Sequence, residues 1–461
     1  MPILSAYVLP HPPLAVPEVG RGEEKKIKKT LAAFDGIAAE IAALSPDTVL
    51  FITPHGVMYS DYFHISPGAG AKGSLARFNA QDARFEVKYD QSLAKEIAGL
   101  CEENGIPAGF LGEKDASLDH GVMVPMWFIN RRFQNYSAVR ISQSGMEPRE
   151  HYRLGQIIAE AAEKTGRRAV LVASGDLSHK LGASGPYGFA PEGERFDKAV
   201  TDALSTGDFL SLLTIPDELR ERAAECGYNS FMVLAGCFDR LCVTSRLLSY
   251  EGTFGVGYAV AGFQPGKRNE SRNFLDIHTD MSMKDARKKQ DSEDCYRALA
   301  RRSLEFAVKN GKALPLPGGL PDELLKNKAG AFVSLHKNGR LRGCVGTISP
   351  TTGNIALEII QNAVSAGLND NRFEPVSAQE LPLLAYKVDI LSPPEAISGP
   401  SELDVKRYGV IVSSGSSRGL LLPNLDGVDT VEQQVDIARR KGGIPDGVPV
   451  RLERFEVTRH E

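Results

Sequence analysis

The chain has 461 residues, of which 42% are apolar and 24% are charged, and its formal net charge is −4. This composition is ordinary for a globular protein, and the slight negative charge gives no electrostatic reason to expect nucleic acid as a partner. No run of 18 uninterrupted apolar residues occurs, so no membrane span is predicted.

A chain of this length exceeds the size of one hydrophobic core, so at least two domains are expected. The N-terminal sequence "MPILSAYVLPHPP" has no basic leader, and the six cysteines form no CxxC pair. Both observations favour a cytoplasmic protein with reduced thiols.

In the first part of the chain, short apolar runs alternate with longer amphipathic segments. The apolar runs predict strands at residues 3–9, 48–53, 136–142, 169–174 and 254–263. The amphipathic patterns predict helices over residues 23–44 and 149–166, and a buried helix is expected to begin at His120 in "SLDHGVMVPMWF". Strands separated by helices of this length indicate an α/β domain with a central mixed sheet flanked by helices.

Three of the predicted strands are followed within a few residues by a histidine, namely His11, His55 and His179. In open α/β sheets, ligands bind in the crevice outside the carboxyl ends of the strands. A non-haem iron(II) site needs two imidazoles and one carboxylate on one face. The segment "RERAAECGYNSFMVL" offers Glu225 as that carboxylate, with Cys226 as a competing soft ligand.

The composition changes after residue 265, where a polar stretch of mixed charge predicts a linker over residues 266–288. The linker would divide the chain into domains 1–265 and 289–461. After it, the sequence predicts a helix from Cys295, a β-hairpin within 329–350, further helices at 354–370 and 430–444, and a strand from residue 385. The second domain is therefore expected to be α+β.

Two arginines and one cysteine in the second domain are candidates for function. In "LRGCVG", the Arg342 cation could lower the pKa of the Cys344 thiol, or the cysteine could be a small buried apolar residue. Arg372, in "NDNRFEPV", could bind an anionic group or hold its own loop.

Motifs in order along residues 1–265 resemble the LigB-type (class III) extradiol ring-cleavage dioxygenases. These motifs are His11, "TPHG" at 53–56, "LDHG" at 118–121, "SGDLSH" at 174–179 and the glutamate near 225. The resemblance implies that His11, His55 and Glu225 bind iron(II), that His179 is an acid/base, and that His120 lines the pocket as a proton donor or oxygen-orienting group. It also implies a small catechol-like aromatic substrate, dioxygen as co-substrate and a homodimer.

Memo-like proteins of the same superfamily have cysteine at the third position, so the "ECG" at 225–227 leaves Glu225 and Cys226 open as alternatives. With Cys226 as ligand, a softer ion such as copper(I) and a different reaction are expected. Two rival functions follow from this resemblance. One is a metal-binding scaffold that presents a substrate to a radical S-adenosylmethionine enzyme, and the other is a zinc-dependent hydrolase or lyase.

The second domain resembles the AMMECR family through "LRGCVG", "NDNRFEPV" and the C-terminal "EQ…KGGI" helix, over roughly residues 290–458. The fusion of the two halves resembles the first two parts of the AmmeMemoRadiSam system, which implies a radical S-adenosylmethionine enzyme as partner. No CxxxCxxC occurs in this sequence, so that iron–sulfur component is not within it.

Overall fold

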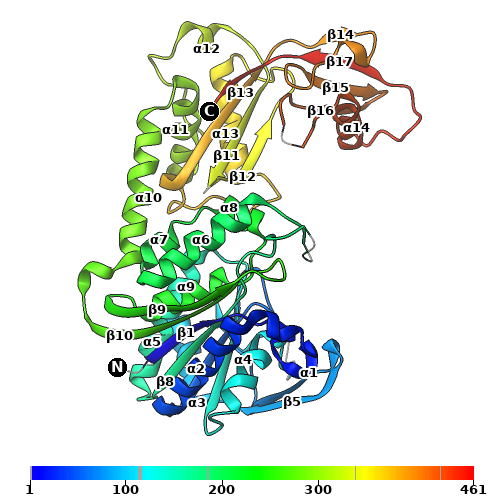
Figure 1. Cartoon of the computed structure of the whole chain (residues 1–461). Helices are drawn as coiled ribbons and strands as arrows, with labels where there is room; N and C mark the ends of the chain where they lie inside the picture. The colour runs from blue at the N-terminus through cyan, green and yellow to red at the C-terminus, as the bar shows by residue number, and fades with distance from the viewer. Residues whose placement is uncertain (1–2, 113–116, 184, 186, 338, 426) are drawn as a thin grey trace. The chain divides into compact units, whose positions relative to one another are not determined.

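A computed structural model of the chain describes residues 3–112, 117–183, 185, 187–337, 339–425 and 427–461 (Figure 1). The chain divides into two compact units, residues 1–279 and 280–461. The stretch expected to be a linker, residues 266–288, contains the end of strand β10 (Tyr258–Arg268) and most of helix α10 (Phe274–Asp291). Among the described residues, no helix is both long enough and apolar enough to cross a membrane.

The first unit is built on a six-stranded sheet with the strand order β7-β2-β8-β1-β10-β9. Strands β7, β2, β8 and β1 are parallel, whereas β10 is antiparallel to both of its neighbours. Besides β10, the sheet contains β1 Ile3–Leu9, β2 Thr48–Thr53, β7 Ser137–Ser142, β8 Ala169–Ser174 and β9 Leu241–Glu251. The predicted mixed sheet is confirmed.

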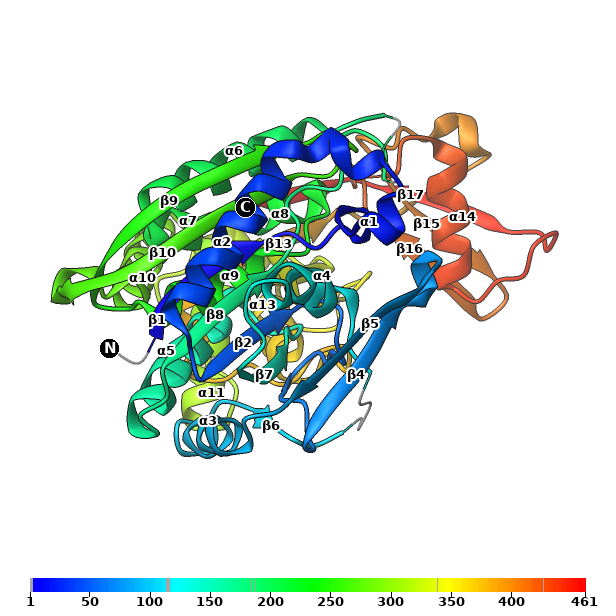
Figure 2. The same ribbon diagram turned by 60° about the horizontal axis from the view of Figure 1, so that its bottom comes forward.

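Successive residues of the central strands point to two separate hydrophobic cores, one on each face of the sheet. On β1, Ala6 and Val8 belong to one core, and Tyr7 and Leu9 belong to the other. Helices cover both faces (Figure 2), which confirms the predicted α/β class. The main helices are α2 Lys28–Leu44, α3 Gln91–Glu103, α4 His120–Asn130, α5 Pro148–Lys164, α6 Pro191–Thr206 and α9 Tyr228–Cys237.

A separate hairpin stands outside the main sheet (Figure 2) and consists of β4 (Gly70–Leu75) and β5 (Ala80–Lys88). The short 3-10 helix η3 (Ala76–Phe78) joins the two strands. The remaining short elements of this unit are α1 Pro17–Gly20, β3 Phe63–His64, β6 Ala108–Gly109, α7 Phe209–Leu213 and α8 Asp217–Ala223.

The last two strands of the main sheet differ from the prediction. Residues 254–263 were expected to form one strand, but β10 begins only at Tyr258 because residues 253–256 form a turn. The preceding strand, β9, was not predicted. It lies at the edge of the sheet, so most of its side chains are half-buried or exposed, and it has no continuous apolar run.

The second unit contains two four-stranded antiparallel sheets, with the orders β12-β11-β13-β18 and β14-β17-β15-β16, and this confirms its α+β class. Helices α11 and α13 share the core of the first sheet, and α14 packs on the second. The helices are α11 Cys295–Asn310, α12 Asp322–Lys326, α13 Ile355–Leu368 and α14 Val431–Lys441. The strands are β11 Ala331–Lys337, β12 Arg340–Gly346, β13 Leu384–Leu391, β14 Glu395–Ile397, β15 Gly409–Ser414, β16 Ser417–Leu421, β17 Arg451–Phe455 and β18 Val457–His460.

Candidate metal centre

The three histidines that follow strands lie at one edge of the main sheet. Strands β2, β8 and β1 are adjacent and parallel, so their carboxyl ends meet at this edge. His11 lies two residues beyond the end of β1, and His55 lies two residues beyond the end of β2. His179 follows β8 at a distance of five residues. The topology therefore places all three side chains in the crevice where open α/β sheets bind ligands.

Two of these imidazoles and one thiol converge on a common point. The Nε2 atoms of His11 and His55 are 2.9 Å apart, and the Sγ atom of Cys226 is 3.6 Å from Nε2 of His11. All three potential ligand atoms lie within 4.8 Å of one another. Two nitrogen ligands at about 2.0–2.1 Å from one ion, and about 90° apart, would be separated by about 2.9 Å. The donor set and its spacing thus fit one metal ion.

The orientation of His11 is fixed by Ser174, the last residue of β8. The Ser174 hydroxyl donates to the carbonyl oxygen of Gly121 at 2.5 Å, so its oxygen must accept from Nδ1 of His11 at 2.9 Å. Nδ1 of His11 is therefore protonated, and the lone pair of Nε2 points toward His55 and Cys226. A metal-binding histidine is commonly held in this way by a hydrogen bond to its second nitrogen.

We expect Ser174→Ala to lower the affinity for the metal by about 10- to 100-fold, because His11 would lose the acceptor that fixes its tautomer. A competition titration with a chromophoric chelator measures this change. Ser205→Ala, which removes an exposed hydroxyl on α6, is the control and should leave the affinity unchanged. An unaltered affinity in Ser174→Ala would show that the hydrogen bond does not orient the ligand.

The two alternatives for the third ligand point in different directions. The Cys226 side chain faces His11, whereas a carboxylate oxygen of Glu225 accepts the backbone N–H of Tyr228 at 2.7 Å, at the start of α9. Burial raises the pKa of Glu225 to about 7. Among the described residues, Glu225 belongs to neither group of side chains that could hold an ion, and Cys226 belongs to both.

A carboxylate that the sequence interpretation missed lies beside this cluster. Asp176 accepts the backbone N–H of His11 at 2.8 Å, and its second oxygen is 3.9 Å from Nε2 of His11. With His179 and Cys226 it forms the second group of potential ligands. Burial raises the pKa of Asp176 to about 7. Asp176 lies two residues beyond the end of β8, as His11 and His55 do beyond their strands, and this shared spacing could have revealed it.

The segments that contain Asp176 and Cys226 cross in very close contact. A Cβ atom added to Gly175 would lie 2.0 Å from the Cα atom of Gly227. The backbone N–H of Gly227 also donates to the carbonyl oxygen of Asp176 at 3.0 Å. The backbones can approach this closely only because both residues are glycines. The proximity of Asp176 to Cys226 therefore depends on Gly175 and Gly227.

His179 is fixed by the residues that precede Cys226. Its backbone N–H donates to the carbonyl oxygen of Ala223 at 3.1 Å, and its Nδ1 is hydrogen-bonded to the carbonyl oxygen of Ala224. A carbonyl can only accept, so Nδ1 has the proton and Nε2 has a free lone pair. Burial lowers the pKa of His179, which keeps the imidazole neutral near pH 7. A positioned neutral imidazole is a suitable proton acceptor.

His120 is a member of the same cluster and not a cap of its helix. It is the first residue of α4, and its ring stacks on that of His55 with 4.1 Å between centroids. The ring of His11 is 5.3 Å away. Burial, with a contribution from the positive charge of Arg77, lowers the pKa of His120 to about 4. His120 is therefore a neutral imidazole that can donate or accept one hydrogen bond.

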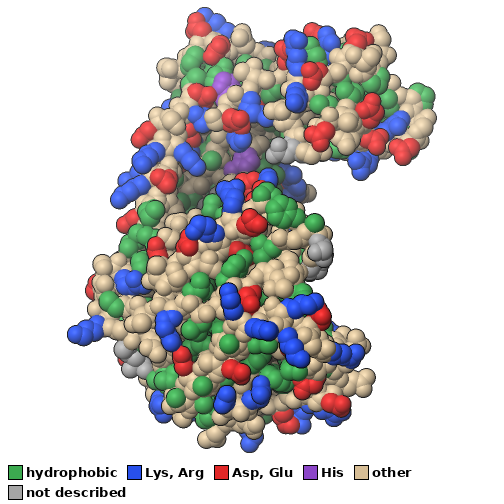
Figure 3. Space-filling model, viewed as in Figure 1, with side chains coloured by type: hydrophobic (Ala, Val, Ile, Leu, Met, Phe, Trp, Pro, Cys, Tyr) green, Lys and Arg blue, Asp and Glu red, His purple; other side chains and the backbone are tan. Residues whose placement is uncertain are grey.

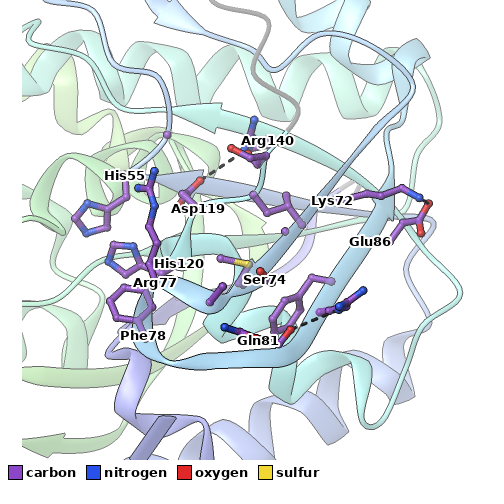
Figure 4. Close-up of a pocket in the computed structure, with 18 of the residues that line it drawn as sticks. His55, Lys72, Ser74, Arg77, Phe78, Gln81, Glu86, Asp119, His120 and Arg140 are labelled. Atoms are coloured by element: carbon purple, nitrogen blue, oxygen red, sulfur yellow. Dashed lines mark hydrogen bonds and ion pairs between the residues drawn. The ribbon is translucent and has the colours of Figure 1, made fainter. Parts of the chain in front are cut away.

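A pocket of about 1320 Å³ opens beside this cluster (Figure 4). His55 and His120 lie at one end, and the β4–β5 hairpin forms much of the wall. Asp119, which precedes His120 in the chain, is linked to His55 through Thr53. Its carboxylate accepts from the Thr53 hydroxyl at 2.6 Å, and the Thr53 hydroxyl oxygen in turn accepts the backbone N–H of His55 at 3.2 Å. Arg140 lies 3.7 Å from the carboxylate of Asp119.

In the second unit, the structure brings Cys344 and Arg372 together. The backbone N–H of Cys344 donates to Asp370 at 2.9 Å, and the Arg372 guanidinium donates to the Cys344 carbonyl oxygen at 3.0 Å and to Asp370 at 2.6 Å. These contacts occupy the free edge of β12, where a further strand would pair. Ser334 donates to the Cys344 thiol at 3.1 Å.

Arg342 is engaged elsewhere in the same unit. Its guanidinium donates to Glu380 at 3.0 Å, and Lys337 lies 3.4 Å from the same carboxylate. Although burial raises the pKa of Glu380, the hydrogen bond from Arg342 and the neighbouring charges lower it to about 2. Arg342 therefore balances a carboxylate, and the Cys344 thiol is hydrogen-bonded by the hydroxyl of Ser334.

Comparison with known proteins gives two family matches. Residues 5–261 match the model of the catalytic LigB subunit of aromatic ring-opening dioxygenase, and residues 297–460 match the AMMECR1 model. A Clostridium acetobutylicum protein is 42% identical over 463 residues, which cover 99% of this chain and 98% of that protein. A Thermotoga maritima protein is 52% identical over 171 residues, covering 37% of this chain and 98% of that protein. A crystal structure of a Pyrococcus horikoshii protein is 31% identical, with a TM-score of 0.34, and the match covers 36% of this chain and 88% of that one.

Proposed function

Because the chain belongs to the LigB family of aromatic ring-opening dioxygenases, with an AMMECR1 domain fused after it, we propose that its first unit is a metal-dependent oxygenase. The metal ligands would be His11, His55 and Cys226, with Asp176 beside them. The substrate would be an aromatic diol of the catechol type, and iron(II) is the ion that the resemblance to extradiol enzymes implies. The observation that supports this proposal most directly is the convergence of His11, His55 and Cys226. The neutral imidazoles of His120 and His179 lie beside these three residues.

When bound by His11, His55 and Cys226, iron(II) would supply a Lewis acid and a redox-active centre beside the pocket. The protein side chains would accept and donate the protons of the reaction. Nε2 of His179 has a free lone pair, so it can accept a proton from a substrate hydroxyl and return it later. His120, whose ring is held against that of His55, would orient the substrate through one hydrogen bond.

The test is metal analysis of protein purified without oxygen, followed by oxygen uptake with a panel of catechols. We expect one equivalent of iron and measurable uptake in the wild type. His179→Ala should keep its metal and lose about 10²- to 10⁴-fold in turnover, the usual loss when a proton-transfer group is removed. His278→Ala, which removes a histidine on α10 that belongs to neither group of potential ligands, is the matched control and should retain full activity. Iron-loaded wild type without uptake on any catechol would reject the oxygenase proposal.

The thiol of Cys226 favours a second candidate function. Thiolate ligands select soft ions, so a site with Cys226 can prefer copper(I) or zinc. The protein would then be a Memo-like metal-binding scaffold that presents a substrate to a radical S-adenosylmethionine enzyme, or a zinc-dependent hydrolase or lyase. Copper or zinc in the purified protein, with no oxygen uptake, would support this second function against the first.

A further inference from the structure

A buried carboxylate contacts the residue that precedes His179. Asp197 on α6 is 1% exposed, and it belongs neither to the pocket lining nor to either group of potential metal ligands. Its Oδ1 atom accepts the backbone N–H of Ser178 at 2.8 Å, and its Oδ2 atom accepts the Tyr250 hydroxyl of β9 at 2.7 Å. Burial raises the pKa of Asp197 to about 7, although these two hydrogen bonds lower it. Neither partner has a positive charge, and a carboxylate that is buried without one is costly, so its hydrogen bonds need an explanation.

Two other segments hold the same serine. The backbone N–H of Gly257, just before β10, donates to the carbonyl oxygen of Ser178 at 2.8 Å. The Ser178 hydroxyl donates to the carbonyl oxygen of Ala223 at 3.0 Å, and that oxygen also accepts the backbone N–H of His179 at 3.1 Å. A Cβ atom added to Gly257 would lie 2.0 Å from Oδ2 of Asp197, so the carboxylate packs directly against the backbone there. Three segments that are separate in the sequence therefore meet around Ser178.

The helix that contains Asp197 gives this arrangement a firm support. Helix α6 has 16 residues, and its inner face belongs to a hydrophobic core of the first unit. Acidic and basic side chains lie on the exposed surface over α6 (Figure 3), whereas Asp197 is directed inward to Ser178. Because Ser178 and His179 are adjacent, a shift of the Ser178 backbone moves the His179 imidazole away from the Ala224 carbonyl that fixes its tautomer. A displacement of about 1 Å in a reacting group can reduce a rate about 10²-fold.

We propose that Asp197 is a positioning residue, which fixes Ser178 so that the His179 imidazole keeps its proton on Nδ1 and its free lone pair on Nε2. The hydroxyl of Tyr250 orients the carboxylate in turn. This role depends on hydrogen bonds and not on negative charge, because an Asn side chain can accept from Ser178 and donate to the phenol oxygen of Tyr250. The effect on proton transfer rests on the proposed function, whereas the effect on the tautomer does not.

The first measurement is the tautomer of His179, by 15N NMR of the full-length protein labelled at histidine, before metal is added, with His179→Gln to assign the signals. We expect the proton on Nδ1 in the wild type and in Asp197→Asn. In Asp197→Ala the Ser178 N–H loses its acceptor, so a mixture of the two tautomers is expected. Asp202→Ala removes an exposed carboxylate from the same helix, and this matched control should give the wild-type spectrum.

The second measurement is the kinetics of oxygen uptake with a catechol. Asp197→Ala should retain its metal and its KM and lose about 10²-fold in kcat, since the ligands are untouched while the proton acceptor is displaced. Asp197→Asn should restore kcat. A residue that only stabilised the fold would lower the unfolding temperature without this split between kcat and KM. Tyr250→Phe removes a single hydroxyl and should shift the tautomer and kcat in the same direction by less, so it tests the inference if Asp197→Ala protein does not fold.

A single Nδ1 tautomer in both Asp197→Ala and Tyr250→Phe would overturn the inference. An Asp197→Asn protein that behaves like Asp197→Ala would overturn it as well. Mixed tautomers in Asp197→Ala, together with a wild type that takes up no oxygen, would retain the positioning role and reject the oxygenase. Oxygen uptake by the wild type, with an unchanged tautomer in both variants, would support the oxygenase and reject the positioning role.

Discussion

Cys226→Ala protein is expected to lose its bound metal, whereas Glu225→Gln protein is expected to keep it. The thiol of Cys226 is 3.6 Å from Nε2 of His11 and lies within the group of convergent ligand atoms. The Glu225 carboxylate accepts a backbone N–H at the start of α9 instead. Since removal of a supporting residue already costs about 10- to 100-fold in metal affinity, loss of a direct ligand should exceed about 100-fold. Elemental analysis and a chelator competition titration measure the difference.

Two controls separate loss of the ligand from loss of the fold. Cys242→Ala removes an exposed thiol on β9 and should leave the metal content unchanged. Thermal unfolding of each variant in the presence of a chelator reports stability without the metal, and Cys226→Ala should then unfold close to the wild type. If Glu225→Gln lost the metal while Cys226→Ala kept it, the carboxylate would be the third ligand and the assignment would be reversed.

Gly175→Ala is expected to damage both the stability of the first unit and its metal site. A methyl group at Gly175 would lie 2.0 Å from the Cα atom of Gly227, so the two backbones must move apart. Overpacking of this kind costs about 1–3 kcal/mol of unfolding free energy. The same movement separates Asp176 from Cys226, so we also expect more than a tenfold loss of metal affinity, since ligand geometry is tightly held in such sites. Denaturant unfolding and a metal titration measure the two effects.

Gly36→Ala is the matched control for this substitution. Gly36 is an exposed residue inside α2, and nothing lies within 4 Å of a Cβ atom added there. Alanine is the better helix former by about 0.5–1 kcal/mol, so this variant should be slightly more stable than the wild type and should bind metal normally. Normal metal affinity in Gly175→Ala would show that the close crossing does not position the ligands.

Much of this site could be predicted because strand ends are visible in the sequence. Apolar runs identified β1, β2 and β8 with their observed bounds, and the adjacency of parallel strands then brought His11 and His55 to one edge. The same reasoning, applied to spacing instead of residue type, would have included Asp176. Asp176 was not predicted because the repeated feature in the sequence is a histidine after each strand, and the carboxylate was expected from a later element.

The choice between Glu225 and Cys226 could not be made from the sequence. The two residues are neighbours in a turn, and the direction of each side chain depends on the backbone around them. Ala224 adopts a left-handed conformation with φ of 53°, and Gly227 packs against Gly175, which is distant in the chain. Both constraints depend on the tertiary structure, so they cannot be inferred from residue type or from the local sequence pattern.

The position of β1 in the middle of the sheet has a consequence for synthesis on the ribosome. Ala6 on β1 pairs with Leu171 on one side and with Phe263 on the other. Neither neighbouring strand exists when residues 3–9 leave the exit tunnel. At about 5–20 residues per second, β10 follows roughly 13–50 s later. Contacts between residues so far apart in the chain also form slowly. Strand β1 therefore waits for two partners that are translated well after it, and until they form it is an exposed apolar segment that chaperones can bind.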